Sequence, residues 1–325
     1  MIIVKKVLFF SWCLWVLSAC QSTVTIPPDW YQQPQINHPV YLIAAGQGRS
    51  LEQAKQMALS QINAQLWTQI DSSFSSRDIF QSQNANTSSS SLVDNKVNSK
   101  TATVILTGIE YPRVEKNDIA YYVQAQVSRA TVIAQLQADI QHSDRQANAQ
   151  ISKRVHQDVL PWWLESRHLL SEINHVAVRQ AMLRSLGASA PAAPQIEQLE
   201  KQVAQAQSSI LIQMIAAANN NKSAELLADK LSTQRLKTSF NQSIQRTHSL
   251  VLTSELRQSR VGDAYISTLF TSLTLQAKDG TILASNEIIS SGNSLSNYAL
   301  SQEAAQRHLM ELIEQQGLWS SLGFK

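Results

Sequence analysis

Two copies of a Glu-x-x-His pattern have the residue types and spacing of metal ligands. Glu165 precedes His168, and Glu172 precedes His175. Residues three apart share a helix face, so each pair could offer a carboxylate and an imidazole to one ion. Both copies fall on one expected helix, where seven residues separate them by about 10 Å, too far for a shared dinuclear centre. We interpret the four side chains as solvated helix charges and expect no metal site.

Other catalytic patterns are incomplete. Gly46-Gln47-Gly48 follows an expected strand and precedes an expected helix, but the third small residue of a dinucleotide-binding turn falls on Leu51. We interpret the glycines as a structural turn. Neither Gly-x-Ser-x-Gly nor His-Glu-x-x-His occurs in the sequence. We expect no catalytic residue and no cofactor, although a hydrolase triad assembled only in space stays open.

The N-terminal segment has the three-part layout of a secretory signal. Lys5 and Lys6 precede an apolar run at residues 7–17, and the small residues Ser18 and Ala19 follow it. The run is shorter than the roughly 20 residues that a membrane-spanning helix needs, so a retained transmembrane anchor is the weaker interpretation. Removing residues 1–19 lowers the formal charge from +3 to +1. A near-neutral chain without a basic run excludes nucleic acid as an expected partner.

The end of this segment contains the residue with the clearest chemistry. The chain has two cysteines, Cys13 and Cys20, which provide no disulfide framework for the body of the protein. Leu17-Ser18-Ala19-Cys20 resembles the lipobox of bacterial lipoproteins. The resemblance implies that Cys20 becomes the N-terminus and carries a diacylglyceryl group and an acyl chain such as palmitate, a permanent anchor in membrane lipid. Gln21 replaces the aspartate of inner-membrane retention, which favours the periplasmic leaflet of the outer membrane of a Gram-negative bacterium.

The mature chain is globular and of α+β class. The full 325-residue sequence is 43% hydrophobic, with 16% charged residues against roughly 25% in an average domain. We expect two small helix-on-antiparallel-sheet domains joined by a long helical segment. The boundaries are a signal peptide at 1–19, a lipidated N-terminus and proline-rich tether at 20–39, a first domain at 40–139, a helical segment and linker at 140–194, and a second domain at 195–325.

In the first domain, apolar runs and turn residues predict a strand, a helix and a β-hairpin. The strand spans 40–45 and ends in a turn at 46–48. The helix starts after Ser50, whose N-cap position and Gln53 form a capping box. Residues 72–99 are Ser/Asn-rich and are expected to be loosely ordered. Hairpin strands are expected at 101–111, ending before Pro112, and at 119–127.

Several of these segments resemble a known family. Trp30, the run from Tyr41 to Gly48, the Ala54/Ala58 helix and the run from Tyr121 to Ala125 are similar to the LPP-twenty family of bacterial outer-membrane lipoproteins, which includes FlgP-like flagellar proteins. The resemblance covers residues 30–139. It implies a helix-on-sheet domain in the cell envelope and transfers no active site. The Trp30-Tyr31 pair is expected to pack where the tether meets this domain.

The helical segment offers two possible contact surfaces. One helix is expected over 129–158, and its apolar stripe could form a homo-oligomer seam. Pro161 is expected to break or kink the chain before a second helix over 162–186. Trp162 and Trp163 could form a partner-binding knob, because tryptophan is favoured at interaction hot spots. The alternative is a core position at a helical elbow.

The sequence pattern of the last third of the chain predicts a strand, a helix, three strands and a final helix capped by Ser301. Over residues 209–317 this order is similar to the TolB N-terminal, CsgG and LpoB domains, which implies a docking module. We therefore expect an outer-membrane-anchored, non-enzymatic scaffold or assembly factor, flagellum-associated in the leading case, with an unidentified envelope protein as partner. The alternative is a periplasm-spanning regulator that binds a peptidoglycan enzyme or a secretion component.

Overall fold

The structure is a computed structural model that describes residues 26–33, 38–81, 104–242 and 245–324. The chain divides into two compact units. Unit 1 comprises residues 1–141 and 175–192, and unit 2 comprises residues 142–174 and 193–325. Each unit combines helices with a β-sheet, which confirms the expected α+β class. The helical segment expected at 140–194 is shared between the two units.

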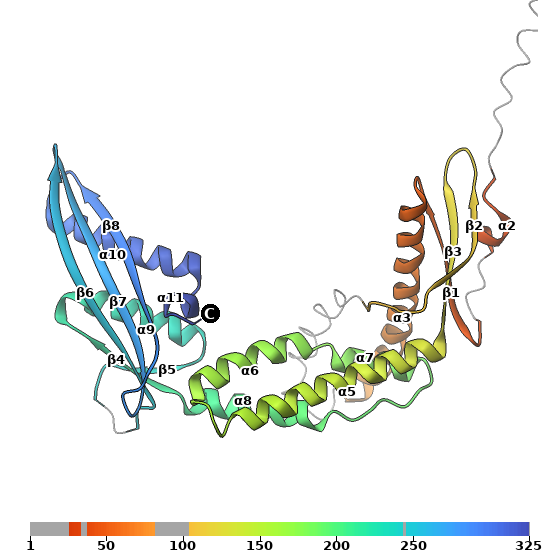
Figure 1. Cartoon of the computed structure of the whole chain (residues 1–325), viewed down its shortest axis with the longest axis horizontal. Coiled ribbons are helices and arrows are strands. Elements are labelled where there is room, and N and C mark those ends of the chain that lie inside the picture. Colours follow the sequence, from red (N-terminus) through yellow and green to blue (C-terminus); the bar gives the residue numbers. More distant parts are fainter. Residues whose placement is uncertain (1–25, 34–37, 82–103, 243–244, 325) are drawn as a thin grey trace, which may run out of the picture. The chain divides into compact units, whose positions relative to one another are not determined.

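Unit 1 contains a three-stranded antiparallel sheet in the order β1-β3-β2 (Figure 1). The strands are β1 (Tyr41–Gly48), β2 (Glu110–Lys116) and β3 (Tyr121–Ser128). Alternate residues of β1 and β3 form the buried face, because side chains alternate across a strand. This face consists of Leu42, Ala44, Val123, Ala125 and Val127. The long helix α3 (Leu51–Gln81) packs against β1 and β3.

The start of α3 has the expected cap. Ser50 Oγ accepts a hydrogen bond from Gln53 N at 3.2 Å, and Gln53 Oε1 accepts one from Arg49 N at 2.9 Å. The helix continues to Gln81, so the expectation of loosely ordered chain is wrong for residues 72–81. A nucleated helix gains one backbone hydrogen bond with each added residue, which outweighs the weak preference of serine. Residues 82–99 of that expectation lie outside the described part of the chain.

Gly46 and Gly48 lie inside β1, so the expected turn at residues 46–48 is wrong. A Cβ atom on Gly46 would collide with the Ala54 carbonyl oxygen and the Ala58 amide of α3. The glycines therefore let the helix backbone approach the strand closely. Ala54 and Ala58 are fully buried at the same contact. Small residues on both elements set this spacing.

The β2–β3 hairpin is displaced from its expected position. β2 begins at Glu110 and includes Pro112, whereas residues 104–109 form no strand. Proline is tolerated because β2 is an edge strand whose register shifts between Glu110 and Arg113. Asn117 Oδ1 closes the turn by accepting hydrogen bonds from Ile119 N at 3.0 Å and Ala120 N at 2.9 Å.

The helices of the central segment are shorter than expected. Helix α5 (Arg129–Lys153) ends before residue 158 and contributes residues to both units. Its apolar stripe includes Leu136, Ile140 and Ala147, each fully buried within the single chain, whereas Val155 lies beyond the helix and is 84% exposed. The buried part of this stripe is therefore unavailable to a second copy of the chain, and oligomerisation stays a prediction. In unit 1, Arg179 of α7 (Val176–Ser185) pairs with Asp139 of α5 at 3.1 Å.

Pro161 does not break the chain. Helix α6 (Val159–Ile173) starts after the N-cap Asp158 and places Pro161 in its first turn. A proline is tolerated there because the first backbone N–H groups of a helix have no partner within the helix. The break falls instead at residues 154–158. A second break at Asn174 and His175 divides the helix that was expected over 162–186.

Unit 2 contains a five-stranded mixed sheet in the order β5-β4-β6-β7-β8. The strands are β4 (Leu211–Ala216), β5 (Lys237–Ser239), β6 (His248–Val261), β7 (Ala264–Ala277) and β8 (Ile282–Ser294). β4 is parallel to β5 and β6, and the other pairs are antiparallel. Helices α9 (Asn221–Thr233) and α10 (Tyr298–Gln316) pack on this sheet (Figure 1). The expected order of elements is confirmed, with the short β5 added.

In unit 2, individual residues determine the β7–β8 turn, the start of α10 and the packing of α10 on β8. Gly280 ends the β7–β8 turn with φ +89°, as expected from the Asp-Gly pair. Asn297 rather than Ser301 caps α10, because its side chain accepts from Leu300 N at 2.9 Å. Ser301 is instead buried within the helix, with its Oγ 2.7 Å from that of Ser267. A Cβ on Gly292 of β8 would collide with Ala305 N of α10, the same glycine-mediated packing as in unit 1.

Candidate functional site

Cys20 lies outside the described residues, but the place where its tether joins unit 1 is visible. The short helix α2 (Asp29–Gln32) lies against the sheet. Trp30 Nε1 donates a hydrogen bond to Glu115 Oε1 at 2.5 Å, and the rings of Tyr31 and Tyr122 meet edge to face at 4.9 Å. The expected packing of Trp30 and Tyr31 where the tether meets the domain is confirmed.

The glycines of β1 do not form a phosphate site. Gly46 and Gly48 are buried, and the space that a side chain would occupy on each is filled by the backbone of α3. A dinucleotide pyrophosphate needs this space between the turn and the helix N-terminus. The structural interpretation of the two glycines therefore holds, although they act within a strand rather than in a turn.

The four Glu-x-x-His residues do not gather at one point, although His168 of the first copy contacts Glu172 of the second. His168 Nδ1 lies 3.6 Å from Glu172 Oε1, and both side chains are largely exposed. Glu165 contacts the Gln157 amide at 2.8 Å and Lys153 Nζ at 3.5 Å. Hydrogen bonding by Gln157 holds the pKa of the Glu165 carboxyl below its ordinary value, with smaller contributions from Gln150 and Lys153. Within the described ranges, no three acidic, histidine or cysteine side chains gather in a group that could hold a metal ion.

Trp162 and Trp163 lie in the core of unit 2, with exposed fractions of 0% and 2%. Trp162 Nε1 donates to the Gln150 carbonyl at 2.8 Å. Arg154 N bonds to Ile151 O instead, so the indole supplies a partner for one of the orphan carbonyls at the end of α5. This burial fits the alternative interpretation of a core position at a helical elbow. In this conformation neither indole is accessible to a partner.

A cleft of about 910 Å³ adjoins the tryptophans within unit 2. Trp319, from the short helix α11 (Leu318–Ser321), lines the cleft and meets the Trp163 ring at 5.9 Å. The side chains around the cleft combine apolar groups with charges of both signs. They include Leu164, Leu169 and Phe324 with Lys153, Glu165 and Arg167. A concave surface lined by apolar side chains and a few charged groups is typical of a site for a small ligand.

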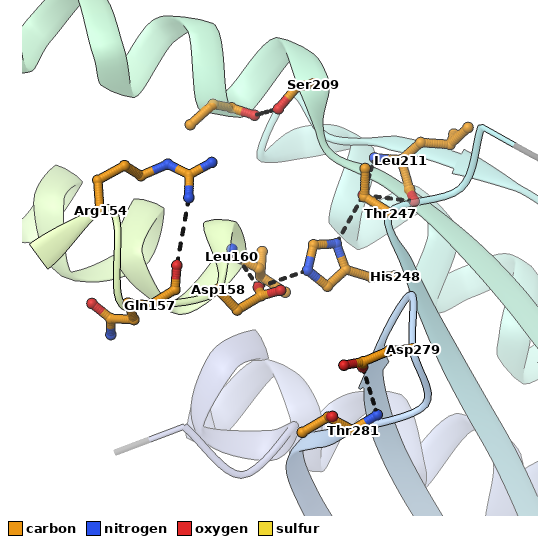
Figure 2. A network of polar contacts seen from close by, with 11 residues as sticks. Arg154, Gln157, Asp158, Leu160, Ser209, Leu211, Thr247, His248, Asp279 and Thr281 are labelled. Atoms are coloured by element: carbon orange, nitrogen blue, oxygen red, sulfur yellow. Dashed lines mark hydrogen bonds and ion pairs between the residues drawn. The ribbon is translucent and has the colours of Figure 1, made fainter.

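A buried polar network joins α6 to the sheet of unit 2 (Figure 2). His248 is fully buried, and its Nε2 lies 2.9 Å from Asp158 Oδ1. Its Nδ1 lies 2.8 Å from Thr247 Oγ1, which accepts from Leu211 N at 2.9 Å. Asp158 Oδ1 also caps α6 by accepting from Leu160 N at 2.8 Å. No sequence motif indicates this contact, because 90 residues separate its two members.

The electrostatics of this network favour the carboxylate form of Asp158. Burial alone would raise the pKa of its carboxyl, but hydrogen bonds from His248 and Leu160, with the charges of His248 and Arg154, lower that pKa below its ordinary value. The network contains the acid, imidazole and hydroxyl groups of a hydrolase triad. However, Thr247 Oγ1 is engaged by both backbone groups of Leu211. This geometry suits fastening of α6 to the sheet better than nucleophilic attack.

Comparison with known families concerns the segment from α2 to the end of β3. Residues 28–128 match the LPP20 lipoprotein family. The resemblance expected from the sequence is thereby confirmed for this segment, which we call the LPP20 segment. With Cys20 upstream, the match indicates a lipoprotein of the bacterial envelope. Within the described ranges, no helix has both the length and the apolar character needed to cross a membrane.

Two solved structures are similar to this chain. The secreted protein HP1454 from Helicobacter pylori has 14% sequence identity, and the alignment covers 86% of this chain and 98% of that one with a TM-score of 0.49. A minor lipoprotein from Acinetobacter baumannii has 11% identity, with coverage of 33% and 90% and a TM-score of 0.27. Comparison with curated proteins finds no significant match. The resemblance of residues 209–317 to TolB-type domains stays a prediction.

Proposed function

We propose that this protein is a non-enzymatic scaffold or assembly factor, anchored through Cys20 in the periplasmic leaflet of the outer membrane. The observation that supports this function most directly is the position of the LPP20 segment, which begins eight residues after Cys20. A short tether places an α+β domain next to the membrane. The leading case is an assembly at the periphery of the flagellar basal body, which the FlgP-like resemblance motivates.

The docking of α2 supports this role. A scaffold must hold its folded domain at a defined distance from its anchor. The contacts of Trp30 and Tyr31 fix the end of the tether to the sheet of unit 1. The tether outside this contact is then short. Unit 2 supplies a separate surface, because its cleft combines apolar and charged side chains. An envelope protein that docks a segment into this cleft would be linked through this chain to the lipid anchor.

The test uses a deletion strain that expresses the wild-type chain, Cys20→Ala or Cys13→Ala. Cys13→Ala is the matched control, because it removes the cysteine of the signal segment and leaves the lipobox-like residues intact. We expect the wild type and Cys13→Ala to fractionate with the outer membrane and to restore swimming in soft agar, whereas Cys20→Ala does neither. Normal swimming of the deletion strain would contradict the flagellar role. Outer-membrane fractionation of Cys20→Ala would contradict the lipid anchor.

The second candidate is a periplasm-spanning regulator that docks on a peptidoglycan enzyme or a secretion component. The cleft of unit 2 favours it, because a regulator needs a site for a partner segment. A photocrosslinking residue at Ser320, which is exposed and lines the cleft, would then capture a defined envelope enzyme. The same residue at exposed Gln315, outside the lining, is the control. Equal products from both positions would contradict docking in the cleft.

A further inference from the structure

One end of the sheet in unit 1 gathers three segments that are distant in sequence. Gly48, the last residue of β1, pairs with Tyr121, the first residue of β3. The β2–β3 turn at residues 117–120 and the start of α3 therefore lie at this end. Helix α2 reaches the same end, because Trp30 bonds to Glu115 and Tyr31 contacts Tyr122. Figure 1 shows α2 beside the upper part of the β2–β3 hairpin.

This end of the sheet exposes aliphatic side chains. Ile119 in the turn is 66% exposed, Ile26 before α2 is 68% exposed, and Leu51 at the start of α3 is 36% exposed. Asn117 alone closes the hairpin turn, so the turn itself has no need for an isoleucine. Single exposed aliphatic residues are ordinary on protein surfaces. We call Ile26, Leu51 and Ile119 together the tip surface.

The position of the anchor distinguishes the tip surface from other exposed aliphatic residues. Ile26 is the sixth residue after Cys20. A fully extended chain spans at most about 3.6 Å per residue, so Ile26 lies within about 22 Å of the lipidated residue. The polar layer on each side of a bilayer is about 5–8 Å thick. The tether therefore ends within reach of the lipid surface, on the part of unit 1 that carries the tip surface.

We propose that the tip surface contacts the lipid leaflet that holds the acyl chains of Cys20, so that unit 1 stands on the membrane with its β2–β3 turn toward the lipid. This inference rests on the lipid anchor of the proposed function. A contact of three side chains is sufficient, because the tether makes binding intramolecular and raises the effective concentration of lipid at the surface.

The charges at this end indicate an apolar rather than an electrostatic contact. Arg49 and Lys116 are exposed there, together with the carboxylates of Glu52, Glu115 and Asp118. The cations do not outnumber the carboxylates, so the surface offers no net attraction to anionic headgroups. The proposal therefore predicts a contact that is insensitive to salt and to the fraction of anionic lipid.

The sequence provides a direct test, because the mature chain has no free thiol. Cys13 is removed with the signal and the Cys20 thiol is lipidated, so Ile119→Cys creates a single site for an environment-sensitive dye. Val40→Cys is the matched control. Val40 is a 53% exposed β-branched residue at the opposite end of the same sheet, next to the Tyr41–Ser128 pair. Both variants are purified as lipidated full-length protein and inserted into phosphatidylethanolamine vesicles with and without phosphatidylglycerol.

We expect the dye at position 119 to shift its emission to shorter wavelength on vesicles and to be quenched several-fold more by spin-labelled lipid than the dye at position 40. High salt and the added anionic lipid should leave this difference unchanged. Equal quenching at the two positions, or stronger quenching at position 40, would overturn the proposal. Flotation of the protein with the vesicles distinguishes a failure of the lipid anchor from a failure of the tip-surface contact. Failure to float contradicts the lipid anchor, whereas flotation without quenching at position 119 contradicts only the tip surface.

Discussion

Nε2 of His248 lies 2.9 Å from Oδ1 of Asp158 and thereby connects the first residue of β6 to the N-cap of α6. The imidazole is fully buried, and its other nitrogen faces Thr247. A buried polar group without a partner is costly, so the carboxylate both satisfies the imidazole and caps the helix. The contact fixes where α6 begins on the sheet of unit 2. The pair therefore fastens the N-terminus of α6, the helix that carries Trp162 and Trp163.

Substitution of Asp158 should destabilise unit 2. Asp158→Ala removes the helix cap and leaves the buried His248 Nε2 without a partner, so we expect a loss of about 2–4 kcal/mol in the free energy of unfolding. Asp158→Asn keeps an oxygen at the cap and should cost less. Urea unfolding followed by tryptophan fluorescence measures the difference. Exposed Asp229→Ala on α9 is the control, and an equal loss in that variant would contradict the assignment.

The same pair predicts an acid-dependent loss of stability. The pKa of Asp158 is lower in the folded protein than its ordinary value near 3.8, so the folded state favours the carboxylate. This contribution is complete above the ordinary value and is lost as the pH falls through the lower folded value. Unfolding free energies of the wild type and Asp158→Asn should therefore converge as the pH falls below about 4. A constant difference across this pH range would show that the charge of Asp158 contributes nothing.

Close packing of a helix on a glycine recurs in the two units and can be tested in parallel. Gly46→Ala and Gly292→Ala each insert a Cβ into the backbone of the covering helix, α3 or α10. Overpacking of this kind costs about 1–3 kcal/mol because the helix must move. Gln47→Ala, at an exposed position of β1, should change stability by less than about 0.5 kcal/mol. Thermal unfolding by circular dichroism compares them, and equal melting temperatures would contradict this packing.

The sequence predicts what depends on local pattern. The β7–β8 hairpin follows from its apolar runs and the Asp-Gly turn, and the start of α3 follows from Ser50 and Gln53. The sequence does not predict the roles of Gly46 and Pro161, because these depend on neighbours distant in sequence or on the place of the residue in a helix. The local pattern predicts a turn at Gly46, whereas the structure uses this glycine inside β1, where α3 approaches the strand closely. The contact between Asp158 and His248 has no local signal at all.

The Trp162 indole is expected to stabilise the end of α5 through its hydrogen bond as well as through the buried area of its ring. Trp162→Phe keeps most of the buried ring but removes the hydrogen bond to the Gln150 carbonyl, which lies at the end of α5. An unsatisfied buried carbonyl costs about 1–3 kcal/mol. Hydrogen exchange should then increase at the last turn of α5. Trp163→Phe is the matched control, because that ring contacts Trp319 and Arg167 rather than the end of α5. Increased exchange in this turn for both variants alike would contradict a specific role of the Trp162 indole.

The docking of α2 predicts a local effect at the start of the folded chain. Tyr31→Ala removes the edge-to-face contact with Tyr122, worth about 0.5–1.5 kcal/mol beyond its buried area, and should release residues 26–33 from the sheet. The rest of unit 1 keeps its core, so limited proteolysis should cleave this segment several-fold faster while thermal unfolding changes little. Tyr298→Ala breaks a ring pair of the same geometry in unit 2, between Tyr265 and Tyr298, and should leave N-terminal cleavage unchanged. Unchanged cleavage in Tyr31→Ala would show that the Trp30 contact alone holds α2 in place.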